Sequence, residues 1–240
     1  MVYQQGTNNN DWIRGTHGDD LLRGLEGDDL IQAGPGNDIV IGDAGNDDLR
    51  GGLGDDWIEG REGNDSLSGG EGQDRLWGDD GNDLVSGGFG NDRLEGDNGD
   101  DQLWGDDGND LLLGESGNDY LVGGDGVDFI YGGDGADTII GGNGDFISTG
   151  TGSDTVIIDG VSQGGQVTVD LQAWEGHYEN LRKTSPDVIE IRNSFGIVNI
   201  ADFRQGYDSI RIVGGNPIVQ TSPPPNHMNI PPFNFPPIYF

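Results

Sequence analysis

The chain has 240 residues, of which 47 are glycine and only 32% are hydrophobic, so an ordinary hydrophobic core is not expected. Its formal net charge of -33 excludes a nucleic-acid backbone and an anionic membrane surface as partners, because like charges repel. The absence of cysteine excludes disulfide bonds and thiolate metal sites as the means of stabilising the fold.

The first residues contain no basic stretch followed by an apolar run, so we expect no cleaved signal peptide. No segment approaches the roughly 18 consecutive apolar residues of a membrane span, so we expect no membrane insertion. The organisation of the chain must therefore be sought in its internal pattern.

A nine-residue repeat fills residues 6–157 in seventeen units. Reading from Gly15 gives GTHGDDLLR, GLEGDDLIQ and AGPGNDIVI, and the register holds without insertion or loss to Ile140. The first unit has Asn9 in place of glycine at position four, and the unit at residues 141–148 is one residue short. In every unit the sixth position or its equivalent is aspartate, and the eighth is Ile, Leu or Val. Such regularity indicates a solenoid.

The first six positions of the unit predict an oxygen-lined turn. Glycine at positions one and four allows sharp turns at positive φ, for which Asn9 is the best non-glycine substitute, and the turn exposes carbonyl oxygens. The aspartate at position six adds a carboxylate. Calcium prefers six to eight oxygen ligands in flexible geometry, whereas magnesium requires a strict octahedron and zinc prefers nitrogen or sulfur. The pattern therefore favours calcium.

Positions seven to nine predict a three-residue strand whose aliphatic eighth position forms the core. Positions seven and nine are often charged, as in Arg50, Glu59, Arg75 and Glu95, so they are expected to face water. One aliphatic residue in nine cannot offset an ordering entropy of roughly 1 to 2 kcal/mol per residue. Folding is therefore expected to depend on the metal.

The pattern GGxGxDxUx, with U aliphatic, resembles the repeat-in-toxin (RTX) family of hemolysin-type calcium-binding nonapeptides over residues 6–157. The resemblance implies an all-β fold, a right-handed parallel β-roll in which successive units alternate between two facing sheets and calcium lies between neighbouring turns. It also implies carbonyl ligands from the turns and carboxylate ligands from Asp11, Asp20, Asp29, Asp38, Asp47, Asp56, Asp65, Asp74, Asp83, Asp92, Asp101, Asp110, Asp119, Asp128, Asp137, Asp145 and Asp154. The departures from the pattern lie at Asn9, at Ala33 and Thr149 in position one, and at the deletion before Asp145.

About one calcium ion per interior repeat, roughly fifteen in all, would nearly cancel the formal charge. Modules of this kind commonly bind calcium at roughly 10⁻⁴ to 10⁻³ M, which favours an unfolded chain in the cytosol and a folded one outside the cell. The resemblance adds export by type I secretion. We therefore expect a secreted or cell-surface protein.

Residues 158–213 predict a small β-rich cap, because alternating apolar runs occur at 166–171, 187–191, 196–200 and 207–213. The end of a repeat array leaves strand edges open, so a cap is physically required. Residues 202–212 also resemble, more weakly, the segment that often closes arrays of this family.

The outward columns of the last repeats become apolar, which indicates that something covers them. Cover by the cap or tail of the same chain and contact with another chain both remain open. The residues concerned are Leu111, Leu113, Tyr120, Val122, Phe129, Tyr131 and Ile140.

Residues 214–240 interleave proline with aromatic residues, a composition that predicts an extended tail. Two interpretations of this tail remain open. It is either an uncleaved export signal, which the family places at the carboxyl terminus, or a docking arm for self-association.

The sequence contains no catalytic motif. His17, His177 and His227 fit no zinc-protease, triad or phosphate-loop pattern, and we expect them to be surface residues. The tryptophans at positions seven and nine are expected to be exposed, either as ordinary surface residues scattered singly or as stacking sites for a glycan or another protein. They are Trp12, Trp57, Trp77 and Trp104.

These patterns favour a non-enzymatic extracellular calcium-binding structural protein: a surface-layer, matrix, adhesive or filament subunit. The alternative is the secretion and folding module of an exported enzyme or toxin. Because repeats follow Met1 almost at once, we expect no catalytic domain before them.

Overall fold

The computed structural model describes residues 1–161, 163, 165–171, 187–194, 197–201, 208–215 and 217–222. These residues form strands and turns only, which confirms the all-β prediction. Within them, no helix has the length and apolar character needed to cross a membrane.

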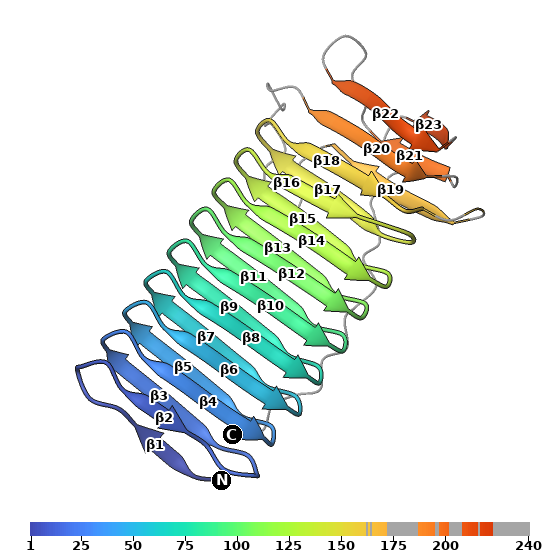
Figure 1. Cartoon of the computed structure of the whole chain (residues 1–240). Helices are drawn as coiled ribbons and strands as arrows, with labels where there is room; N and C mark the ends of the chain where they lie inside the picture. The colour runs from blue at the N-terminus through green and yellow to red at the C-terminus, as the bar shows by residue number, and fades with distance from the viewer. Residues whose placement is uncertain are drawn as a thin grey trace.

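The strands form two parallel sheets, and successive strands alternate between them, as expected for a β-roll (Figure 1). The 12-stranded sheet contains β1 (Tyr3–Gln5), β3 (Leu21–Glu26), β5 (Ile39–Ala44), β7 (Trp57–Glu62), β9 (Arg75–Asp80), β11 (Arg93–Asn98), β13 (Leu111–Ser116), β15 (Phe129–Asp134), β17 (Phe146–Thr151), β19 (Gln166–Asp170), β21 (Ile197–Ala201) and β23 (Ile218–Ser222). The 11-stranded sheet contains β2 (Trp12–Arg14), β4 (Leu30–Pro35), β6 (Asp48–Leu53), β8 (Ser66–Glu71), β10 (Leu84–Phe89), β12 (Gln102–Asp107), β14 (Tyr120–Asp125), β16 (Thr138–Gly141), β18 (Thr155–Asp159), β20 (Val188–Ser194) and β22 (Ser209–Gly215).

The strands of the repeats are longer than the sequence pattern predicts. Most have six residues rather than three, because each continues through positions one to three of the next unit. Position one is therefore a buried strand residue, and it shares the inward face with position eight. The ladder pairs residues 18 apart over most of the roll, as in Leu76 with Leu94, so every column contains the same repeat position.

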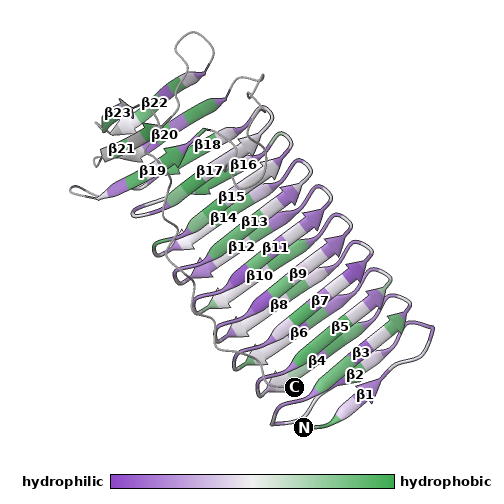
Figure 2. Ribbon diagram, turned by 180° about the vertical axis from the view of Figure 1, so that it is seen from behind, coloured by the Kyte–Doolittle hydropathy of each residue, from purple (hydrophilic) through white to green (hydrophobic). Residues whose placement is uncertain are grey.

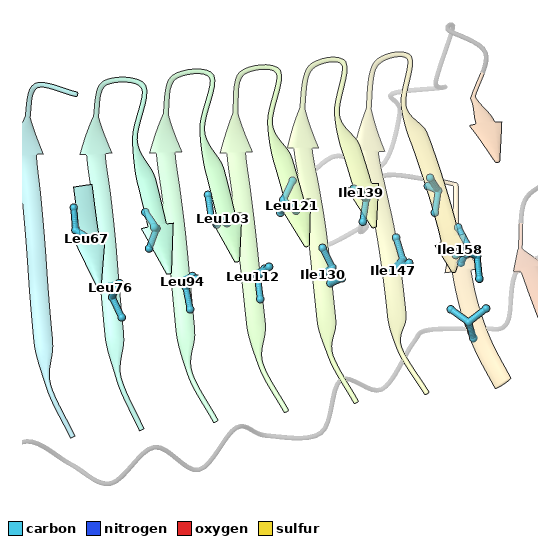
Figure 3. Close-up of a cluster of buried hydrophobic side chains, with 14 of the residues drawn as sticks. Leu67, Leu76, Leu94, Leu103, Leu112, Leu121, Ile130, Ile139, Ile147 and Ile158 are labelled. Carbon is cyan, nitrogen blue, oxygen red and sulfur yellow. The ribbon is translucent and has the colours of Figure 1, made fainter. Parts of the chain in front are cut away.

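The core consists of two rows of aliphatic side chains between the sheets (Figure 3). Leu67, Leu76, Leu94 and Leu103 belong to these rows, and each is at most 1% exposed. Burial of one such side chain stabilises a fold by about 1.5 to 3 kcal/mol, and each nine-residue unit contributes only one from position eight. The prediction that position eight forms the core is confirmed.

Beyond the last repeat, strands β19 to β22 continue the two sheets (Figure 1). Strands β19, β20 and β21 each have two buried aliphatic residues instead of one aliphatic residue and one glycine, as with Ile189 and Ile191 in β20, whereas Ile210 of β22 is half-buried and Ile212 is 53% exposed. Strand β23 extends the 12-stranded sheet within the segment assigned to the tail. Residues 202–207 of the proposed closing segment and residues 223–240 of the tail lie outside the described residues.

The predicted apolar columns are half-buried, except that Leu111 is only 8% exposed. The rings of Phe129 and Phe146 stack on neighbouring strands with their centroids 4.9 Å apart. Figure 2 shows hydrophilic residues gathered along the turns and apolar ones along the strands. The turns form the two long edges of the roll, and they contain many of its acidic side chains.

Candidate calcium-binding edges

The position-six aspartates lie side by side along the two edges of the roll, each directly before a strand. They are at most 3% exposed from Asp20 to Asp154, whereas Asp11, at the N-terminal end, is half-buried. Burying an ionised carboxylate is costly unless it is paired or binds a cation. The fold thus brings the predicted site residues into two continuous buried rows.

From Asp29 to Asp154, one carboxylate oxygen of each position-six aspartate links neighbouring turns. Oδ1 of Asp83 accepts a hydrogen bond from the backbone N–H of Asp65 at 2.7 Å, and Oδ1 of Asp101 accepts one from Asp83 at 2.8 Å. On the other edge Asp56 and Asp74 make the same bond at 2.8 Å. The two rows of bonds satisfy buried N–H groups that the strand ladder leaves unpaired. We call each row an aspartate ladder.

The other oxygen, Oδ2, has no hydrogen-bond partner in most of these residues, although it is buried. A buried acceptor without a partner typically costs about 1 to 3 kcal/mol, and more if it is charged. The residues concerned are Asp29, Asp38, Asp47, Asp56, Asp65, Asp74, Asp83, Asp92, Asp101, Asp110, Asp119 and Asp128. A repeated cost of this kind indicates that a ligand completes the turns.

The glycine at position one keeps the space beside Oδ2 open. A Cβ atom on Gly69 would lie 2.3 Å from Oδ2 of Asp74 and 2.7 Å from the carbonyl oxygen of Gly87, which belongs to the next turn of that edge. A Cβ on Gly60 would likewise lie 2.4 Å from Oδ2 of Asp65 and 2.8 Å from the oxygen of Gly78. The open volume is therefore bordered by oxygens from two successive turns.

Burial raises the pKa of these carboxyls, and neighbouring carboxylates add to the effect. The pKa is raised to about 8 for Asp56 and Asp110 and to about 7 for Asp65 and Asp74. Desolvation and like charge both disfavour the ionised form of these carboxyls. A divalent cation between the turns would favour the ionised form by supplying counter-charge.

This donor set fits calcium. It consists of carboxylate and carbonyl oxygens, the ligands that a hard cation requires. Within the described residues no group of three or more His, Cys, Asp or Glu side chains converges on one point. The position-six carboxylates and the backbone carbonyl oxygens of the adjacent turns are the groups that would hold each ion.

The backbone of the turns corrects one prediction. Positive φ occurs at positions two and four, as at Asp79 (71°) and Gly81 (152°), and not at position one. Glycine is favoured at position one because of the space it leaves, not because of its φ, and Ala33 and Thr149 occupy this position in two units. Asn9 and Gly18, at position four of the first two units, do not adopt positive φ either.

The aspartate ladder extends beyond the recognisable repeats. Oδ1 of Asp187 accepts a hydrogen bond from the N–H of Asp154 at 3.1 Å, and Oδ1 of Asp208 accepts one from Asp187 at 3.2 Å. Both side chains are buried. These two aspartates were not predicted as site residues, although each stands two residues before a buried or half-buried isoleucine, as a repeat aspartate does.

A second ladder at position five was also missed. Oδ1 of Asn64 accepts a hydrogen bond from the N–H of Asn82 at 2.7 Å, and Oδ1 of Asn82 accepts one from Asp100 at 2.9 Å. These bonds run in the opposite direction to the aspartate ladder. The frequent Asn or Asp at position five is the sequence feature that could have predicted this ladder. A short side-chain oxygen can accept a hydrogen bond from a backbone N–H of the adjacent turn.

The tryptophans are not all scattered singly, contrary to one of the two interpretations. Trp57 and Trp77 are half-buried and stack with ring centroids 4.7 Å apart, whereas Trp12 is 72% exposed. His17 is exposed, as expected. His177 and His227 lie outside the described residues.

The comparison with protein families agrees with the geometry. The family described as RTX calcium-binding nonapeptide repeat (4 copies) matches overlapping segments that together span residues 5–145, namely 5–40, 23–58, 41–76, 50–85, 77–112, 86–121 and 113–145. No curated protein matches the chain. The buried aspartate rows and this match lead to one conclusion: the chain belongs to the RTX family of calcium-binding nonapeptide repeat proteins.

Proposed function

We propose that this protein is an extracellular structural protein that folds when it binds calcium along both edges of the roll. The observation that carries the proposal is the pair of buried aspartate rows with unpartnered Oδ2 atoms. Calcium binding would convert the cost of these buried carboxylates into stabilisation, because metal affinity for a site that forms only in the folded state adds to the folding free energy.

The ion would act as the main staple of the fold. The repeats have few inward aliphatic side chains, and the chain has no disulfide bond, since it lacks cysteine. A formal charge of -33 opposes compaction. About one ion for each interior repeat would remove most of this repulsion, so the calcium requirement follows from charge as much as from geometry.

The proposed location is outside the producing cell. Extracellular modules commonly bind calcium at roughly 10⁻⁴ to 10⁻³ M, a range in which a cytosolic chain would stay without the ion. Export before folding, by a type I system, fits this dependence. The function in that location would be to form a rigid rod with a surface for contacts.

We further propose a non-enzymatic role as a subunit of a surface layer, matrix, adhesive or filament. The described charged and aromatic residues fit structural roles: the aspartates form ladders, Arg61 pairs with Glu59 and Asp43, and Trp57 stacks on Trp77. Self-association through the apolar columns near β13 to β17 would make such a rod into an assembly. The competing role is a folding and secretion module of an enzyme or toxin.

Circular dichroism of the chain with a chelator, with millimolar magnesium and with millimolar calcium tests the folding proposal. At neutral pH we expect much more β structure with calcium than in either of the other two solutions. Equal spectra in all three solutions would overturn it.

Electron microscopy of the same samples tests the structural role. Filaments or lattices that need calcium support it, and monodisperse rods at high concentration favour the module role instead. Magnesium is the matched control, because it has the same charge but requires stricter geometry.

A further inference from the structure

Three of the repeat turns differ from the others in how the position-six carboxylate is satisfied. Oδ2 of Asp11 accepts hydrogen bonds from the N–H of Thr7 at 2.5 Å and from its Oγ1 at 2.8 Å. Oδ2 of Asp20 accepts the same pair from Thr16, at 2.6 and 2.8 Å. At the short unit, Oδ2 of Asp145 accepts the N–H of Gly142 at 2.6 Å.

The donor is in each case the residue at position two, and its backbone conformation sets these turns apart. In the units between Gly24 and Gly141 every position-two residue has positive φ, from 69° at Asp97 to 128° at Gly52. Thr7, Thr16 and Gly142 do not. Threonine is β-branched, so positive φ is strongly disfavoured for it.

The direction of one peptide group explains the correlation. The N–H of position two and the carbonyl of position one belong to the same planar trans peptide and point in opposite directions. A turn that directs this N–H at its own Oδ2 therefore turns the position-one carbonyl away from that oxygen. The turn places a hydrogen-bond donor where a cation would otherwise lie.

The position of the carboxylate also separates these three turns from the interior ones. A Cβ built on position one lies 2.8 Å from Oδ2 at Gly6, and 3.0 Å from it at both Gly15 and Gly141. In the units that begin at Gly24, Gly42, Gly51, Gly60, Gly69, Gly78, Gly87, Gly96, Gly105, Gly114, Gly123 and Gly132, the same separation is 2.1 to 2.5 Å. In the three exceptional turns the carboxylate has moved toward its hydrogen-bond donor.

We infer that the backbone conformation at position two decides whether a turn binds calcium, and that the turns of Asp11, Asp20 and Asp145 are closed by hydrogen bonds and bind none. This inference rests on the proposed calcium binding and specifies which turns take part. Among the seventeen units, threonine occupies position two only in the first two, which lie on opposite edges. Each edge of the roll thus begins with an ion-free turn, in which a neutral donor replaces the cation that an exposed end would hold weakly.

A stoichiometry measurement on the full chain tests the inference in both directions. In Thr16→Asn the new residue tolerates positive φ and lacks the branched side chain, so we expect one more calcium ion per chain than in the wild type. Thr16→Val keeps the branched shape and the N–H donor, so the number of ions should not change. Equilibrium dialysis followed by atomic emission gives the number of ions.

The opposite exchange uses Leu25, which has a φ of 94° in the interior turn of Asp29. Leu25→Thr should close that turn and remove one ion, whereas Leu25→Asn, the matched control, should keep it. Circular dichroism in millimolar calcium shows whether each variant folds, and a crystal structure of Thr16→Asn with calcium would show the added ion at Asp20.

The possible failures are distinguishable. If the wild type binds calcium but Thr16→Asn and Leu25→Thr have the wild-type number of ions, the inference is wrong and the proposed function stands. If the wild type binds no calcium, both are wrong. If Leu25→Thr does not fold, the comparison of Thr16→Asn with Thr16→Val decides the matter by itself.

Discussion

The N–H of Asp65 donates to Oδ1 of Asp83 at 2.7 Å, and the two residues occupy successive turns of one edge. Oδ2 of Asp83 is buried and has no hydrogen-bond partner. The two oxygens of one carboxylate thus have separate roles, one in the hydrogen-bond ladder and one in the open space beside Gly78. This division allows the two roles to be tested separately.

Asp83→Asn retains the Oδ1 acceptor and removes the charge, whereas Asp83→Ala removes both. With saturating calcium we expect the melting temperature to fall in the order wild type, Asn, Ala. The alanine variant should lose about 1 to 3 kcal/mol more in free energy of unfolding, because the N–H of Asp65 is left unpaired. In chelator at pH 8 the Asn variant should be at least as stable as the wild type, because no buried charge remains at position 83. Calorimetry in the two buffers measures the order.

The exposed Asp107 provides the control for this pair, since Asp107→Asn removes one negative charge outside the ladders. We expect its free energy of unfolding to change by less than about 0.5 kcal/mol in either buffer. Equal stabilities of Asp83→Asn and Asp83→Ala would contradict a separate role for Oδ1.

Gly69→Ala should disrupt one turn without any change of charge. The added methyl would lie 2.3 Å from Oδ2 of Asp74, so the carboxylate must move and its cation space is filled. We expect one calcium ion fewer per chain and a higher calcium midpoint for folding, followed by circular dichroism. Gly18→Ala is the control, because a Cβ there meets no atom within 4 Å.

The calcium-free chain should become less stable as pH rises. Burial raises the pKa of Asp56 and Asp110 from 3.8 to about 8, so the folded state binds more protons than the unfolded state between these values. The free energy of unfolding therefore falls as pH increases from about 4 to about 8. Far-ultraviolet circular dichroism in chelator should show more β structure at pH 5 than at pH 8.5.

Calcium should reverse this trend, because the ion replaces the protons. Its apparent affinity should decrease as the pH is lowered through the same range, with protons released on binding. Calcium-free spectra that do not change between pH 5 and pH 8.5 would show that the buried carboxyls do not control folding.

Asp187→Ala should loosen the end of the roll beyond the repeats. Oδ1 of Asp187 accepts the N–H of Asp154, and its own N–H donates to Asp208. Loss of the side chain removes the first of these bonds, so we expect faster hydrogen exchange in β18 and β20 and unchanged exchange in β8 and β10. Mass spectrometry of peptic fragments measures both regions in one experiment, and uniform exchange changes would count against a local role.

The repeat, the inward aliphatic column and the position-six aspartates can be predicted from the amino-acid sequence, because each depends on a strict period of nine. The repeat pattern alone assigns Val85 to the core and Asp83 to the edge, since strand alternation fixes their directions. The alternation of sheets came from the family resemblance, and the structure confirms it.

The partner of each carboxylate oxygen becomes evident only when the turns are stacked in the fold. Oδ1 of Asp83 meets a residue 18 positions away, and the space at Gly78 is defined by the adjacent carboxylate, so neither follows from one unit alone. The ladder through Asp187 and Asp208 was hidden because the spacing changes to 33 and 21 residues while the strand register is kept. The different role of Thr16 depends on the sign of φ and the direction of one N–H, which a residue pattern does not contain.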